Sequence, residues 1–175
     1  MWRDFQVDLK RYINDPRDRR NIYLLFDQGI WAVFFYRFGR WAHLVQIPLI
    51  NILLRLIAFI LFKWTEITSG ISIPASAQVG PGFYVGHFGG IFLHSDAVLG
   101  RNCSIGPGVM IGARGLGRKG VPVIGDNVYI GVGAKVLGPI RIGNNVRIGA
   151  NTVVLTDVPD GVTVVGTSSR IVKNA

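Results

Sequence analysis

Cysteine, histidine and acidic side chains are all scarce in this sequence. Cys103 is the only cysteine, so the chain has no internal disulfide, which fits a reducing compartment. There are three histidines, and their spacing gives only one plausible near pair, so we expect no metal site. Ten acidic residues against 19 lysines and arginines leave a formal net charge of +9. This balance favours a partner with phosphate groups or an anionic membrane surface.

Glycine is scarce in the first part of the chain and abundant in the second. Residues 1–66 contain two glycines and the rest of the chain contains 21. The first part has the long apolar runs of helices, whereas the second has the short runs and turns of strands. We therefore predict an N-terminal helical region over residues 1–69 and a mainly β domain over residues 70–175.

The run from Leu44 to Phe62 is apolar enough to suggest a membrane. Its 19 residues are about the length that spans a bilayer. Arg55, near the middle, would cost about 2.5–3.5 kcal/mol in a span. A helix that lies in the membrane interface avoids most of this cost. A true span and a helix buried against its own oligomer are the alternatives.

Polar and aromatic positions favour the interfacial helix. Pro48, Asn51 and Arg55 recur every three or four residues, so they form one stripe of a helix, which we expect to face water. Aromatic and basic side chains act as interfacial anchors in such helices. The expected anchors are Trp31, Tyr36, Arg37, Arg40, Trp41, Lys63 and Trp64. We therefore predict peripheral membrane contact through residues 22–64.

In the second part an aliphatic residue returns every six positions. The strictest run is Ile124, Ile130, Val136, Ile142, Ile148 and Val154, and earlier runs are Ile73, Val79, Val85, Ile91 and Leu99, Ile105, Ile111. A period of six fits neither a helix nor a single half-buried strand. A chain that runs straight and then turns returns such a side chain to the same inward corner, and three sides make a triangular coil. We predict a β-helix of stacked coils. The small residues Val128, Ala134, Val146 and Thr152 are expected to point inward as well.

This period of six is broken twice. It slips by two residues between Ile91 and Leu99. It breaks again at residues 112–123, "GARGLGRKGVPV", which are glycine-rich and basic and cannot keep the inward pattern. We predict that residues 112–123 form a loop extruded from one corner, and long loops on a rigid scaffold are usually functional.

Three stretches resemble a known family: "VGPGFYVGHFGGIFLHSDAVLGRNCSIGPGVMIG", "IGDNVYIGVGAKVLGPIRIGNNVRIGANTVVLTDVP" and "VVGTSSRIV". The family is that of the hexapeptide-repeat acyltransferases, and the chain is most similar to its serine acetyltransferase-like branch, which includes O-acetyltransferases of polysaccharide gene clusters. The resemblance covers residues 71–173. It implies a left-handed parallel β-helix, a homotrimer, and transfer of an acetyl group from acetyl-CoA to a hydroxyl.

The resemblance assigns the catalytic role to His87, because His87-Phe88-Gly89-Gly90 matches the H-x-x-G segment of the family. An alcohol attacks a thioester effectively only as its proton is removed, and imidazole suits that general-base role. In serine acetyltransferases an aspartate fifteen residues earlier orients the histidine, but Ser72 stands here. Ser72, Asp96 or a backbone carbonyl are the candidate orienting partners. His94 is a second histidine that could face the same cleft.

Two further departures bear on the acceptor. The family's aspartate directly before the catalytic histidine is Gly86 here, and its Arg-His pair before a proline is Gly120-Val121. The groups that would hold the charges of a free amino acid are therefore missing. We expect a hydroxyl of a sugar or polysaccharide precursor as the acceptor, with serine O-acetyltransferase of cysteine biosynthesis as the alternative.

The resemblance also implies contacts with coenzyme A. By motif position, the corners Gly131-Val132 and Gly149-Ala150 match those that line the pantetheine arm, although glycines there are also ordinary repeat residues. Further candidates, most of them basic side chains suited to phosphates, are Ala113, Arg114, Arg118, Lys119, Arg170 and Lys173.

A different class of function stays open, which is a non-catalytic, membrane-associated β-helical scaffold. Binding of nucleic acid is not expected, because the hexads lack aromatic side chains interleaved on a basic face. Since coenzyme A is cytosolic, we expect the protein in the cytoplasm, at the cytoplasmic face of the inner membrane.

Overall fold

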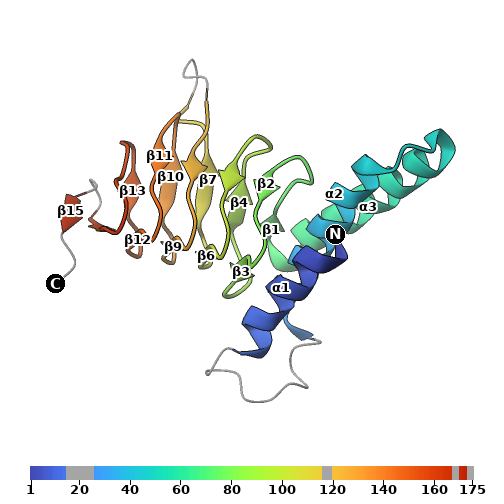
Figure 1. The fold of residues 1–175 in the computed structure, drawn as a ribbon, viewed down its shortest axis with the longest axis horizontal. Coiled ribbons are helices and arrows are strands. Elements are labelled where there is room, and N and C mark those ends of the chain that lie inside the picture. The colour runs from blue at the N-terminus through green and yellow to red at the C-terminus, as the bar shows by residue number, and fades with distance from the viewer. Residues whose placement is uncertain (15–25, 116–119, 167–169, 173–175) are drawn as a thin grey trace.

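The computed structural model describes residues 1–14, 26–115 and 120–166, together with the backbone of residues 170–172. Three helices stand at one end of a prism of short strands (Figure 1). They are α1 (Trp2–Ile13), α2 (Gln28–Leu44) and α3 (Pro48–Ser69). Gly70 ends α3 in the left-handed conformation, with φ 64°, and turns the chain into the first strand.

The strands are each two or three residues long. They are β1 (Ile71–Ser72), β2 (Gln78–Val79), β3 (Tyr84–Val85), β4 (Ile91–Leu93), β5 (Val98–Leu99), β6 (Ser104–Ile105), β7 (Met110–Gly112), β8 (Val123–Ile124), β9 (Tyr129–Ile130), β10 (Lys135–Leu137), β11 (Arg141–Ile142), β12 (Arg147–Ile148), β13 (Val153–Val154), β14 (Thr163–Val165) and β15 (Arg170–Val172).

These strands form three sheets, and each sheet takes every third strand of most of the chain. The sheet orders are β1-β4-β7-β10-β13, β11-β8-β5-β2 and β15-β14-β12-β9-β6-β3. The pairings are parallel except that of β14 with β15, which is antiparallel. The chain therefore winds round three sides of a triangular prism, as the period of six predicts.

The period of six marks the inside of this prism. The aliphatic residues from Ile124 to Val154 that recur every six positions are each 2% exposed or less. Val128, Ala134, Val146 and Thr152 are also buried, as predicted. One row of side chains from each corner thus stacks on the row of the next coil, and this stack is the hydrophobic core.

Helices α1 and α2 cap the open end of the prism, where β2 and β3 are the last strands of their sheets. The guanidinium of Arg37 donates to the Val79 carbonyl at 2.6 Å and to the carboxylate of Asp8 at 2.8 and 3.2 Å. Asp8 also accepts the backbone N–H groups of Gly82 and Phe83 at 2.7 and 2.8 Å. Both charged side chains are buried. They satisfy backbone groups that a further coil would otherwise satisfy.

Two of the expected membrane anchors belong to this cap. Tyr36 is buried, and its hydroxyl donates to the Ala77 carbonyl at 2.8 Å and accepts the N–H of Val79 at 3.0 Å. Arg37 is the buried partner of Asp8. The prediction that these two side chains lie at a membrane interface is therefore wrong. A helix face that closes a solenoid has the same apolar and aromatic composition as one that meets lipid, so the pattern did not separate the two cases.

The polar stripe of α3 is divided between the neighbouring helix and solvent. The Asn51 amide donates to the carbonyls of Ala42 and Val45 at 2.8 Å, so it satisfies the end of α2. Arg55 lines a cavity between α2 and α3. Asn51 therefore faces the neighbouring helix, whereas Pro48 and Arg55 are exposed, as predicted for the stripe.

The other side of α3 is exposed and strongly apolar. By length and composition this helix could cross a membrane, and 11% of its apolar window is buried in the structure. Its side chains that are more than half exposed include Leu49, Ile52, Leu53, Leu56, Phe59, Ile60, Trp64 and Ile67. Within the described residues, nothing covers this face.

Candidate active site

His87 lies on a corner of the prism that is longer than the corresponding corner of the next coil. Val85 pairs with Ile105, and Leu93 pairs with Ile111. Val85 and Leu93 are eight positions apart in the sequence, whereas their partners in the next coil are six apart. Two extra residues are therefore accommodated between β3 and β4. The slip of two residues therefore lies between Val85 and Leu93, and not between Ile91 and Leu99 as predicted, because Ile91 pairs with Ile71 while Leu93 takes the inward position in line with Ile111.

Glycines allow the bulge to turn back into the prism. Gly89 and Gly90 have φ values of 101° and 64°, which side chains rarely adopt. The N–H of Gly89 donates to the Ser69 carbonyl at 2.8 Å, and the Gly89 carbonyl accepts the N–H of Gly108 at 2.8 Å. The end of the bulge is thus fixed to α3 above and to the next coil below, while His87 and Phe88 are exposed.

The predicted pantetheine corners lie in the same column as His87. Gly86 donates to Ile105, Gly106 to Ile130 and Gly131 to Ile148, at 2.9, 2.9 and 2.8 Å. The residue that follows each glycine is therefore stacked along one edge of the prism, and these residues are His87, Pro107, Val132 and Ala150. Because coils stack about 4.8 Å apart, the backbone at His87 and the backbone at Val132, two coils away, lie roughly 10 Å apart along this edge.

The glycines of this column are required by the stacking itself. A Cβ at Gly131 would lie 2.8 Å from the backbone nitrogen of Ala150, and one at Gly106 would lie 2.9 Å from that of Val132. The corner is therefore smooth, with small or apolar residues beside an exposed histidine. Such an edge could hold an extended, uncharged chain, which is the shape of a pantetheine arm.

The other cofactor candidates lie elsewhere or outside the described residues. Ala113 and Arg114 are exposed and follow β7, at a different corner from His87. The backbone of Arg170 pairs with Val165 on β14, and its side chain lies outside the described residues. Arg118, Lys119 and Lys173 also lie outside them. Their roles stay predictions.

Neither proposed orienting partner is hydrogen-bonded to His87 within the described residues. Ser72 Oγ donates to Glu66 Oε1 at 2.6 Å, and the sequence analysis had not singled out Glu66. Asp96 is exposed, and its Oδ2 lies 3.8 Å from Nδ1 of His94. His94 thus has Asp96 beside it at the corner after β4, away from the column of His87. No spacing rule links Glu66 to Ser72, because the pair spans the end of a helix and a turn.

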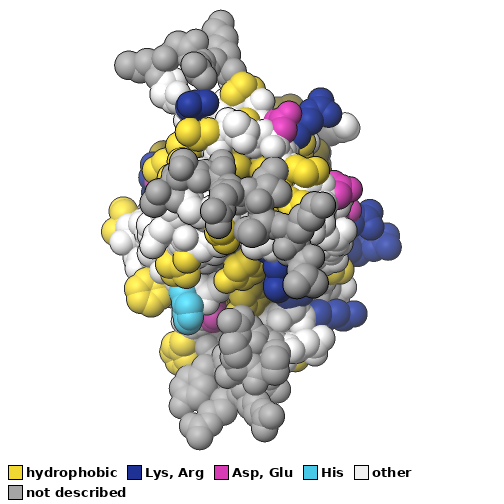
Figure 2. Space-filling model, turned by 90° about the vertical axis from the view of Figure 1, so that its left-hand side faces the viewer, with side chains coloured by type: hydrophobic (Ala, Val, Ile, Leu, Met, Phe, Trp, Pro, Cys, Tyr) yellow, Lys and Arg dark blue, Asp and Glu magenta, His cyan; other side chains and the backbone are white. Residues whose placement is uncertain are grey.

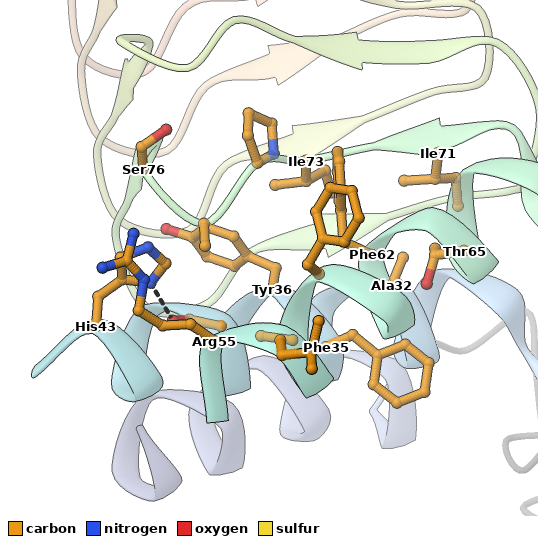
Figure 3. Close-up of a pocket in the computed structure, with 16 residues that line it drawn as sticks. Ala32, Phe35, Tyr36, His43, Arg55, Phe62, Thr65, Ile71, Ile73 and Ser76 are labelled. Carbon is orange, nitrogen blue, oxygen red and sulfur yellow. Dashed lines mark hydrogen bonds between the residues drawn. The ribbon is translucent and has the colours of Figure 1, made fainter. Parts of the chain in front are cut away.

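One enclosed cavity lies away from His87. It has a volume of about 400 Å³ and lies between α2, α3 and the first coil, lined by aromatic side chains such as Phe35 and Phe62 (Figure 3). His43 and Arg55 lie at one end of it, where His43 Nδ1 is 2.8 Å from the Gly39 carbonyl oxygen. None of the predicted site residues lines this cavity. Among the described residues no group of three or more His, Cys, Asp or Glu side chains could hold a metal.

The repeat is that of a known family, since residues 122–156 match the family described as bacterial transferase hexapeptide (six repeats). A serine acetyltransferase of Synechococcus elongatus is 37% identical over 171 residues, covering 97% of this chain and 66% of the relative. One of Staphylococcus xylosus is 42% identical over 161 residues, covering 91% and 71%. The serine acetyltransferase of Brucella abortus strain S19 superposes with a TM-score of 0.85 at 30% identity, covering 98% of this chain and 68% of that one. A second structure of that protein is in complex with coenzyme A.

The chain belongs to the hexapeptide-repeat acyltransferases, in the serine acetyltransferase-like branch. Its prism is accordingly a left-handed parallel β-helix. The chain spans about two thirds of the length of the relatives it matches, with 66% and 71% for the two named above.

Proposed function

We propose that this protein is an acetyl-CoA-dependent O-acetyltransferase in which His87 is the general base. The observation that carries the proposal is the position of His87 on a bulged corner, in one column with the smooth edge formed by Gly131-Val132 and Gly149-Ala150. The complex of a related structure with coenzyme A supports the choice of co-substrate.

The reaction follows from the chemistry of the imidazole. His87 removes the proton of the acceptor hydroxyl as its oxygen attacks the thioester carbonyl carbon of acetyl-CoA. The tetrahedral intermediate then collapses, the carbon–sulfur bond breaks, and the leaving sulfur takes the proton from the imidazolium. The products are the acetyl ester and free coenzyme A, and His87 returns to its neutral state.

The acceptor has two candidates. The names of the relatives favour serine and do not support the sequence-based preference for a polysaccharide precursor. One observation still favours a neutral sugar hydroxyl. Gly86 and Gly120-Val121 carry no charge at the positions where family members hold the ammonium and carboxylate of serine. A buried or half-buried site without these groups would bind an uncharged hydroxyl better than a zwitterion.

Coenzyme A release tests both points. The protein is incubated with acetyl-CoA and a thiol reagent, with serine in one series and nucleotide sugars in the other. We expect His87→Ala to lower kcat/KM by about 10²–10⁴-fold, the usual contribution of a general base. His94→Ala is the matched control, because this histidine lies at another corner. Full activity of His87→Ala would refute the role of His87 as the base. If coenzyme A is released neither with serine nor with nucleotide sugars, and calorimetry detects no binding of coenzyme A, the non-catalytic scaffold is favoured.

We also propose the family homotrimer and contact of α3 with an anionic membrane, so that the protein lies at the cytoplasmic face of the inner membrane. The exposed apolar face of α3, its half-exposed Trp64 and Lys63, and the net charge of +9 support membrane contact. Seen along the prism, many of the visible lysines and arginines gather on one side and a histidine with hydrophobic side chains on the other (Figure 2). Flotation with vesicles containing phosphatidylglycerol is the test. Protein that stays at the bottom and forms larger oligomers would show that α3 meets another copy instead.

A further inference from the structure

The group that orients His87 is unassigned, and the end of α3 offers one. We propose that Glu66 and Ser72 are positioning residues for His87, with the Glu66 carboxylate acting on the imidazole through the Ser72 hydroxyl. This inference rests on the proposed role of His87 as the general base. Where serine acetyltransferases have one aspartate at this position of β1, this chain would use the hydroxyl of Ser72 on β1 together with the carboxylate of Glu66 on α3.

The contacts of Glu66 prepare it for this role. Ser72 Oγ donates to Glu66 Oε1 at 2.6 Å, and Lys63 Nζ donates to Glu66 Oε2 at 2.6 Å. Partial burial alone would raise the pKa of Glu66, but the hydrogen bonds from Lys63 and Ser72 and the charge of Lys63 lower it. The carboxylate is therefore ionised at neutral pH. A serine hydroxyl that donates its proton to a carboxylate keeps its lone pairs free to accept an imidazole N–H.

The backbone places Ser72 beside the corner that carries His87. The Ser69 carbonyl accepts the N–H of Gly89 at 2.8 Å, and Ser72 pairs in register with Phe92. Paired strands lie about 4.8 Å apart. The segment that holds Ser72 thus runs directly along the segment that follows His87.

The direction of the Ser72 side chain also fits. Ile71 and Ile73 are buried in the prism, so the residue between them points to the outer side, where Phe92 is exposed. The competing candidate, Asp96, is exposed and lies next to His94. Among the described carboxylates, Glu66 is the one joined to a residue that lies alongside the bulge.

The test uses two changes that alter charge with little change of shape. We expect Glu66→Gln to lower kcat/KM at least about tenfold, as loss of an orienting partner does. The acid limb of the pH profile should move to lower pH, because a base without a nearby negative charge is protonated less readily. Ser72→Asp in the Glu66→Gln background restores a carboxylate on β1, and we expect it to regain most of the lost activity. Asp96→Asn is the control, since it removes an exposed carboxylate that lies next to His94 instead.

The outcomes separate this inference from the proposed function. If His87→Ala abolishes transfer but Glu66→Gln changes neither the rate nor the pH profile, the positioning role is wrong and the base stands. A loss in Glu66→Gln that Ser72→Asp does not repair, with an unchanged pH profile, would indicate a structural tie only and overturn the proposal. NMR of the His87 ring gives a readout that needs no acceptor. The ring-nitrogen chemical shifts should change in Glu66→Gln, and unchanged shifts contradict the proposal.

Discussion

The prism and helix α3 bury their apolar side chains in opposite ways. In the prism, the aliphatic residues from Ile124 to Val154 at six-residue spacing are each 2% exposed or less. In α3, 11% of the apolar window is buried. Each coil of the prism finds its partner in the next coil, whereas α3 contacts α2 and the first strand and leaves its outer face open within the described residues. A strict period thus predicts a core formed within the chain. High hydropathy alone predicts only that the apolar face needs some partner, such as protein or lipid.

The largest expected effect on stability comes from the buried ion pair that joins the helices to the prism. Asp8→Ala leaves Arg37 as a buried charge without its carboxylate and removes the acceptor of two backbone N–H groups. We expect a loss of about 3–5 kcal/mol in the free energy of unfolding. Urea denaturation of the variant, with Lys10→Ala on the exposed side of the same helix as control, measures it. Equal stability of the two variants would mean that the cap does not depend on this pair.

The same substitution in both regions sharpens the comparison. Ile130→Ala removes a fully buried side chain from the prism, and we expect a loss of about 2–5 kcal/mol. Ile60→Ala, at a side chain that is 57% exposed on α3, should change stability by less than about 0.5 kcal/mol. Denaturation curves of both variants, measured without lipid, test this. A comparable loss at Ile60 would show that its face is covered in solution.

The titration of Cys103 tests whether water is excluded from the core of the prism. Burial raises the pKa of its thiol to about 11, whereas cysteine in an unfolded chain titrates near 9.0. The folded state therefore holds this proton more tightly, and stability must fall as the pH rises from about 9 to about 11. The full effect is about 2–3 kcal/mol.

Unfolding measured between pH 8 and pH 11 in the unchanged protein and in Cys103→Ala isolates this effect, because Tyr12 and Tyr36, whose hydroxyl pKa values burial also raises, are present in both. The fall should be smaller in Cys103→Ala. Two parallel curves would contradict a desolvated thiol.

The smallest effect is expected at Thr152. Its hydroxyl oxygen is buried and has no hydrogen-bond partner among the described residues. Thr152→Val replaces this oxygen with a methyl group of similar size, so we expect stability to rise by about 1 kcal/mol. Thr156→Val at an exposed position is the control. A loss of stability at position 152 would reveal a partner for the hydroxyl in solution.

Much of the β domain could be read from the sequence because its rule is local. Each coil repeats one pattern, so the inward positions and the strand period are visible as spacing. The first break was predicted after Ile91, but it lies before it, at the His87 corner. The resemblance to the family, and not the spacing, assigned His87 as the base and Val132 and Ala150 to the pantetheine arm. The stacking of the coils places these residues along one edge of the prism, through the backbone hydrogen bonds that Gly86, Gly106 and Gly131 donate to the next coil.

The helical region was read less well because its contacts are long-range. Tyr36 and Arg37 look like interfacial residues in sequence, yet they bind backbone groups of the first coil some forty residues away. Asn51 looks like part of a wet stripe, yet it satisfies the end of α2. Helical periodicity shows which residues share a face and is silent on what that face meets.

The sequence by itself determined the solenoid and most of its inward residues, since a six-residue repeat forces each coil to pack on its neighbour. Only the tertiary structure decided that α1 and α2 close the open end through Asp8 and Arg37, and that Glu66 reaches Ser72. The reason is physical. These contacts satisfy unpaired backbone groups and a hydroxyl at the end of a helix. No period in the sequence predicts which side chain makes such a contact.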